Sequence, residues 1–262
     1  MVVLILAFVF IIGACLGSFL NVVILRLPSF EHHFLTTRSY CYNCRQTLWV
    51  RDLLPIFSWF FLKGRCRFCH HQFSLRYPLV ELSIAVLAVV CAVFSDTPIQ
   101  GFEIFFLCTI LIAVGLIDLD TWIIPLQLPI LITLSGLGFG YVQSLSLFYD
   151  RLIGLMAGFI FFAVFLLVST WILRAIKRLQ ADENSMGWGD PILIGAIGAN
   201  IGWFWLSWMI LLASFQGIVL YVIFSFKKQP FQGDDWVPPQ RSMPFGPFLA
   251  LAAIEITLWN LI

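Results

Sequence analysis

The sequence has little charge. Of its 262 residues, only 11% are Asp, Glu, Lys or Arg, whereas an ordinary soluble domain has roughly 25%. Hydrophobic residues make up 61%, more than a soluble fold of this length can bury, so lipid must solvate most of the chain. The net charge of +1 provides no strong basic or acidic field, and we therefore expect no nucleic-acid partner.

The N-terminal segment lacks the basic n-region of a cleaved signal peptide. Residues Met1 to Leu25 are instead apolar throughout. Such a run is long enough to cross a bilayer as a helix. We therefore expect it to be a retained first transmembrane helix.

Long apolar runs are what the sequence has in abundance, and they predict an all-α polytopic membrane protein with about eight transmembrane helices. The last pair before the C-terminal run covers 37 residues, too many for one crossing, and Gly198 to Gly202 offers a turn between them. We divide the chain into a first helix at 1–25, a cytosolic loop domain at 26–76 and a membrane bundle at 77–262. The predicted spans lie at about 1–25, 77–95, 101–117, 124–147, 152–173, 190–203, 204–226 and 246–262.

The Lys and Arg residues give these spans an orientation. With eight spans, fourteen of the fifteen fall on one side of the membrane, and only Arg151 falls on the other. By the positive-inside rule, the side with the fourteen is the cytoplasm, which puts the N-terminus outside. The fourteen are Arg26, Arg38, Arg45, Arg51, Lys63, Arg65, Arg67, Arg76, Arg174, Lys177, Arg178, Lys227, Lys228 and Arg241.

Four cysteines in the cytosolic loop form two CxxC pairs. Cys41 and Cys44 make the first pair, and Cys66 and Cys69 make the second. Two such turns can supply four thiolates to one tetrahedral ion, and a reducing cytoplasm disfavours disulfides. We predict a structural Zn²⁺ site with a closed coordination sphere, the alternative being four reduced, unliganded thiols.

The histidines of this loop have a weaker case as ligands. His70 and His71 follow the second CxxC pair and could replace a cysteine, while His32 and His33 have no partner at ligand spacing. We expect all four to be solvated loop residues.

Two aspartates at predicted helix ends are the candidate catalytic pair. Asp118 ends the third span and Asp190 opens the sixth, so the predicted topology places both at the cytoplasmic face. Facing carboxylates can share a proton, the arrangement by which aspartic proteases activate water. Gly187 and Gly189 would let a substrate backbone approach Asp190. The alternative is that these carboxylates only end or cap their helices.

Two further acids leave open questions. Asp120 lies about 200° around a helix from Asp118, so it is either a competitor for the same role or a supporting residue at the interface. Glu255 lies deep in the last span. It could join the two aspartates in a proton relay of a transporter, but a relay needs groups along the full depth of the membrane.

Six ordered segments resemble the bacterial type IV prepilin peptidases, a family of aspartic peptidases with a GxGD segment. In chain order they are GSFLNVVILRLP (17–28), the two CxxC pairs, RYPLVEL (76–82), IDLDTWIIP (117–125), GWGD (187–190) and PFGPFLAL (244–251). The resemblance implies that Asp118 and Asp190 are the catalytic pair. It also implies a multi-pass protein of the bacterial inner membrane.

The resemblance further implies an activity with two steps. Such enzymes cut the leader of type IV prepilins or pseudopilins after a Gly at the cytoplasmic face, in pilus assembly or type II secretion. Many then methylate the new N-terminus with S-adenosylmethionine. Two positions depart from the family pattern, Leu126 in place of Asp and Ile192 in place of Lys. They keep open the alternative of an impaired relative that binds pilins as an assembly scaffold.

Overall fold

A computed structural model gives the structure of the chain and describes residues 1–28, 38–176, 187–225 and 244–261. Some residues named above lie outside these ranges. They are the histidines at 32 and 33, and five cations of the charge count: Lys177, Arg178, Lys227, Lys228 and Arg241.

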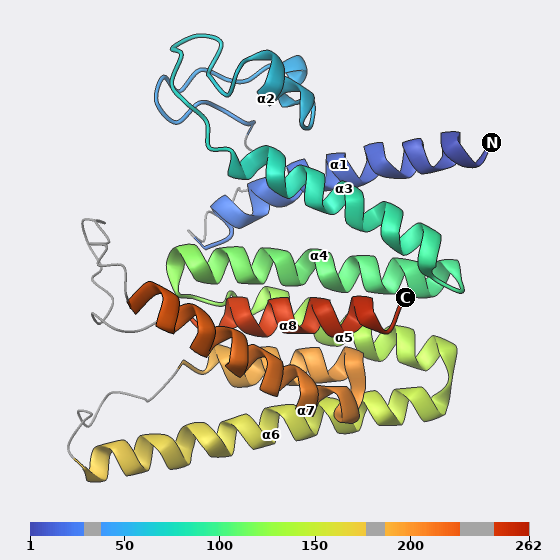
Figure 1. Cartoon of the computed structure of the whole chain (residues 1–262), viewed down its shortest axis with the longest axis vertical. Helices are drawn as coiled ribbons and strands as arrows, with labels where there is room; N and C mark the ends of the chain where they lie inside the picture. The colour runs from blue at the N-terminus through green and yellow to red at the C-terminus, as the bar shows by residue number, and fades with distance from the viewer. Residues whose placement is uncertain (29–37, 177–186, 226–243, 262) are drawn as a thin grey trace. The chain divides into compact units, whose positions relative to one another are not determined.

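The described residues are mostly helical and contain no named strand, which confirms the predicted all-α class (Figure 1). Outside the helices, the same ranges contain two isolated β-bridges. The elements are α1 (Val2–Arg26), the 3-10 helix η1 (Val50–Leu53), α2 (Phe57–Phe61), α3 (Arg76–Phe94), α4 (Pro98–Thr121), α5 (Gln127–Gln143), α6 (Leu145–Ala175), α7 (Gly189–Ser225) and α8 (Gly246–Trp259).

Five of these helices, α1, α3, α4, α6 and α7, are long and apolar enough to cross a membrane. The α5 and α8 helices are apolar but shorter, with 17 and 14 residues. Within α7, Gly202 has φ 75° and ψ 172°, which no helix allows. Figure 1 shows α7 as two orange arms that run in opposite directions. The turn between the predicted spans 190–203 and 204–226 is therefore confirmed.

Replacing Gly202 by Ala should destabilise the protein. Its dihedral angles lie in a region that only glycine adopts readily, and forcing a side chain into it costs about 1–3 kcal/mol. There is open space around the residue, so the loss would come from the backbone conformation alone. Thermal unfolding in detergent measures it. Gly138→Ala, at an open position inside α5, is the control, and an equal effect of both changes would contradict this account.

The chain forms two compact units that divide within α4. The first comprises Met1–Thr109 together with Leu261. In it α1 packs against α3, and the side-chain amide of Asn21 on α1 donates to the carbonyl of Tyr77 on α3 at 3.1 Å. The segment that carries the cysteines and α2 belongs to this unit.

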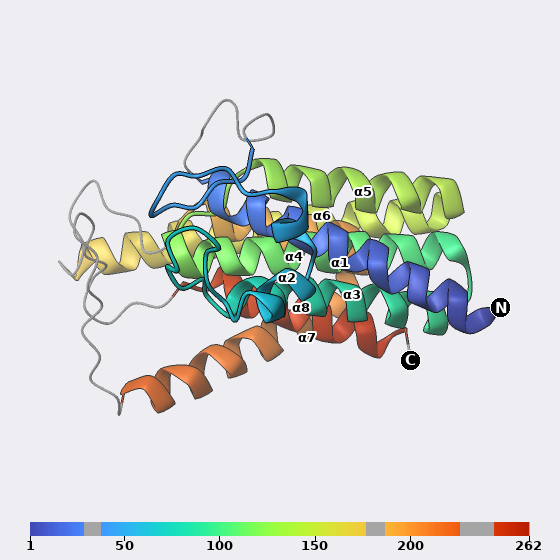
Figure 2. The same cartoon turned by 90° about the horizontal axis from the view of Figure 1, so that it is seen from above.

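The second unit, Ile110–Asn260, is built around the first arm of α7. Both α5 and α6 pack against α7 and against each other, and α8 also packs against α7. Figure 2 shows α5 and α6 side by side. Asn200 on α7 donates to the carbonyl of Ile132 on α5 at 2.8 Å. Arg151, the single cation predicted outside, is buried on α6 and donates to the carbonyl of Gly136 at 2.6 Å.

Candidate functional site

Asp118 lies in the last turn of α4 and is buried, with 5% of its surface exposed. The backbone N–H of Gly246, the first residue of α8, donates a hydrogen bond to its carboxylate. A buried carboxylate needs such donors because it has lost its water shell. The start of α8 therefore fixes the orientation of the Asp118 side chain.

Asp190 lies in the first turn of α7 and is half-buried. The helix begins at Gly189, so Asp190 stands inside the first turn rather than at the N-cap position. The charge of Asp118 acts on the carboxyl group of Asp190. The two acids, 72 positions apart in the sequence, thus belong to one unit, and the charge of one acts on the other.

Ile124, in the connection between α4 and α5, occupies the space between two helix starts. A Cβ atom added to Gly189 would meet its side chain at 3.2 Å, and one added to Gly246 would meet it at the same distance. Gly189 thus makes room for the side chain of Ile124, and its role in admitting a substrate backbone stays a prediction. Neither Ile124 nor Gly246 was a predicted site residue. The only signal for Gly246 was its place in the segment PFGPFLAL.

The other predicted residues lie outside this cluster. Asp120 is exposed on α4, and Gly187 stands in open surroundings before α7. Glu255 on α8 accepts a hydrogen bond from the side-chain amide of Gln216 at 2.6 Å. Of the two departures from the family pattern, Leu126 is 53% exposed, and Ile192 is half-buried.

The four loop cysteines form a cluster of a size that suits one metal ion. Their Sγ atoms all lie within 4.8 Å of one another. The Sγ atoms of Cys41 and Cys69 are 3.7 Å apart, close to the ~3.8 Å that tetrahedral Zn–S bonds of ~2.3 Å require. The gathering of Cys41, Cys44, Cys66 and Cys69 is therefore confirmed, and a metal such as zinc fits it.

The two CxxC turns have the same backbone construction. In the first, Cys41 N–H donates to Gln46 at 3.0 Å and Arg45 N–H donates to Cys41 at 2.7 Å. In the second, Cys66 N–H donates to His71 at 2.8 Å and His70 N–H donates to Cys66 at 3.0 Å. An isolated β-bridge closes each turn, and in each the residue after the second cysteine has a positive φ. Each turn can thus present two thiolates to one ion.

This construction leaves His70 in a turn position, with φ 57°, and among the described residues the metal cluster comprises the cysteines alone. The backbone N–H of His71, followed by the side-chain amide of Asn43, lowers the pKa of the Cys69 thiol to about 6. The amide nitrogen of Asn43 lies 3.6 Å from this sulfur. Such donors favour the thiolate, which is the form that binds zinc.

Removing the metal should leave leader cleavage, the reaction implied by the resemblance, partly intact, because the cysteines and the aspartates belong to different units. We expect Cys66→Ser to lower the zinc content of the purified protein well below one ion per chain. Metal analysis measures this, with Cys91→Ser, at a buried cysteine outside the cluster, as the control. Wild-type protein that holds far less than one zinc would contradict the site.

The chain matches two family models in succession. Residues 11–95 match the Bacterial Peptidase A24 N-terminal domain. Residues 105–222 match the Type IV leader peptidase family.

Several curated proteins resemble the chain over nearly its whole length. A prepilin leader peptidase/N-methyltransferase of Aeromonas salmonicida is 33% identical, over 96% of this chain and 90% of its own. One of Myxococcus xanthus is 30% identical, over 96% of this chain and 89% of its own. A type 4 prepilin-like proteins leader peptide-processing enzyme of Escherichia coli is 32% identical, over 92% of this chain and 89% of its own. No solved structure shows a significant match to the chain.

Proposed function

Because the chain belongs to the type IV leader peptidase family, we propose that it removes the leader of prepilins or pseudopilins and then methylates the new N-terminus. The resemblance predicted from the six sequence segments is confirmed. The observation that supports the peptidase step best is the electrostatic interaction of Asp118 with Asp190, two acids at helix ends of one unit.

The proposed catalytic pair is Asp118 and Asp190, acting as one proton-sharing unit. One carboxylate takes a proton from a water molecule, which attacks the carbonyl carbon of the scissile peptide. The other gives its proton to the departing amine as the C–N bond breaks. The Gly246 N–H on Asp118 supports this role, because it holds one carboxylate in a fixed orientation while the protons move.

We further propose a multi-pass arrangement in the bacterial inner membrane, with the N-terminus outside and the zinc loop in the cytoplasm. The working parts would be the first helix at 1–25, the zinc loop at 26–76 and the peptidase bundle at 77–262. Zinc would shape the loop without entering the reaction, since four protein ligands close its coordination sphere. S-adenosylmethionine would supply an electrophilic methyl group.

Co-expression with a prepilin tests both activities. A mobility shift of the pilin reports leader removal, and mass analysis of the mature N-terminus reports an added methyl group. No shift with any of several pilins would overturn the peptidase and favour a pilin-binding scaffold, the alternative that Leu126 and Ile192 raise.

A further inference from the structure

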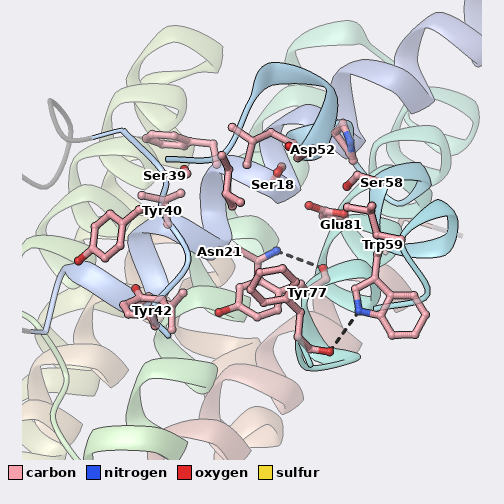
Figure 3. Close-up of a pocket in the computed structure, with 18 of the residues that line it drawn as sticks. Ser18, Asn21, Ser39, Tyr40, Tyr42, Asp52, Ser58, Trp59, Tyr77 and Glu81 are labelled. Atoms are coloured by element: carbon pink, nitrogen blue, oxygen red, sulfur yellow. Dashed lines mark hydrogen bonds between the residues drawn. The ribbon is translucent and has the colours of Figure 1, made fainter. Parts of the chain in front are cut away.

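The first unit contains a cavity that is lined by the buried acid Glu81. Its volume is about 420 Å³, within the ~300–1,000 Å³ range of small-molecule sites. Its walls come from α1, from the start of α3 and from the segment that carries the cysteines and α2. Figure 3 shows the carboxylate of Glu81 pointing into this space beside Ser18.

Two acidic side chains line the cavity, and their surroundings differ. Asp52 forms an ion pair with Arg67 at 2.5 Å, so its charge is compensated. Glu81, which is 9% exposed, accepts hydrogen bonds from neutral donors, the backbone N–H of Ile56 at 2.6 Å and the hydroxyl of Ser18. Among the described residues no cation forms an ion pair with Glu81. Its negative charge is thus available to a cationic group that enters the cavity.

The backbone next to Glu81 is strained. Ile56 has φ 63°, a conformation that is a genuine outlier for a β-branched residue. Its N–H is the group that Glu81 accepts. Strained residues that the surrounding structure holds in place are concentrated at functional sites.

The remaining walls suit a sulfonium compound that carries an aromatic base. Aromatic faces attract such cations and stack on bases. Trp59 is held by a hydrogen bond from its ring nitrogen to the Phe73 carbonyl at 3.3 Å, and Asn21 by its bond to the Tyr77 carbonyl at 3.1 Å (Figure 3). The bond to Tyr77 leaves the amide oxygen of Asn21 to accept from a ligand. Tyr40, Tyr42 and two cations, Arg26 and Arg65, also line the cavity.

We propose that this cavity is the methyl-transfer site and that Glu81 accepts the proton of the substrate amine there. The inference rests on the proposed methyltransferase function. S-adenosylmethionine supplies the methyl group when it is bound. Glu81 takes a proton from the ammonium group of the newly exposed N-terminus. The amine nitrogen then bonds to the methyl carbon as the C–S bond breaks, and that electron pair stays on the sulfur of a neutral thioether.

Proton transfer to Glu81 is reasonable in this setting. A carboxylate and an ammonium group that meet away from water both lose hydration, so exchange of the proton to give a neutral pair becomes less costly. The charges also balance, since the two cations and one carboxylate before transfer become one N-methylammonium and one protonated Glu81. No further reactant is needed.

Two variants of the full chain test the proposal. Ser58 lines the cavity, and Ser58→Phe should weaken binding of S-adenosylhomocysteine, measured by calorimetry, by about tenfold or more. Ser83→Phe, on the exposed face of α3, is the matched control and should bind as the wild type does. Glu81→Gln keeps an oxygen for Ile56 and removes the base, so methylation near neutral pH should fall about 10²-fold or more.

The pH dependence separates a proton acceptor from a merely structural residue. A free α-amino group loses its proton near pH 8. Methylation by Glu81→Gln should therefore recover as the pH rises above about 8, whereas a structural defect would persist. The zinc content of the same samples reports the folding of the first unit, because the four cysteines of the metal cluster belong to it.

The possible failures can be told apart. Wild-type protein that adds no methyl to cleaved pilin would overturn the methyltransferase function and this inference with it. If the wild type methylates the pilin but Ser58→Phe binds S-adenosylhomocysteine normally, this cavity is not the binding site, and the methyltransferase function itself still stands. A Glu81→Gln defect that high pH does not relieve would overturn the role of Glu81.

Discussion

Asp118→Asn and Asp190→Asn should each abolish leader removal while the protein still inserts in the membrane. Asparagine fills the same volume but cannot take up or give a proton, so general acid–base catalysis by the pair is lost. We expect cleavage of a co-expressed prepilin to fall by about 10³-fold or more. The mobility of the pilin on a gel, with quantification of the uncut form, measures this.

Two more Asp→Asn variants sharpen the result. Asp150 is an exposed acid on α6, and Asp150→Asn should cleave as the wild type does. Asp120→Asn tests whether Asp120 takes the catalytic role in place of Asp118. Because Asp120 is exposed while Asp118 is buried, we expect this variant to keep cleaving. Retained cleavage by Asp118→Asn or Asp190→Asn would remove that residue from the catalytic pair.

Gly246→Ala should reduce leader cleavage about 10- to 100-fold, although it adds a single methyl group. The new Cβ atom would lie 2.5 Å from an oxygen of Asp118 and 3.1 Å from its carboxyl carbon. The carboxylate would have to move, and a displacement of about 1 Å at a reacting group can cost 10²-fold in rate. The rate of pilin cleavage by the purified variant measures this effect.

Gly115→Ala is the matched control for this change. Gly115 is also a glycine at the contact between α4 and α8, but a Cβ atom there would meet Ala250 at an ordinary 3.5 Å. Both variants should show similar thermal unfolding. Full activity in Gly246→Ala would mean that the position of the Asp118 carboxylate does not limit the rate.

Much of the helical arrangement could be predicted because lipid imposes it. An apolar run must become a helix in hydrocarbon, where every backbone polar group needs an internal partner. The turn at Gly202 could also be predicted, since 37 residues are too many for one helix to cross the membrane and the segment contains glycines that can form a turn. The length of α8, 14 residues, was not predictable from hydropathy, because apolarity continues past the end of a helix.

The candidate site shows where sequence reasoning stops. Asp118 and Asp190 could be found because acids at membrane depth are costly and therefore rare. Gly246 and Ile124 position the site through contacts between segments that are distant in the sequence, and their local sequence does not indicate these contacts. Glu81 stands in the segment RYPLVEL of the sequence, but only the fold shows the cavity beside it.

The position of Ile124 has a consequence for how this enzyme could vary. One aliphatic side chain keeps apart the backbone that carries one carboxylate and the backbone that orients the other. The spacing of the two acids is then set by a residue that takes no part in the chemistry. A smaller or larger aliphatic residue at position 124 would change the distance between the carboxylates of Asp118 and Asp190. Both acids, and their charges, would stay as they are.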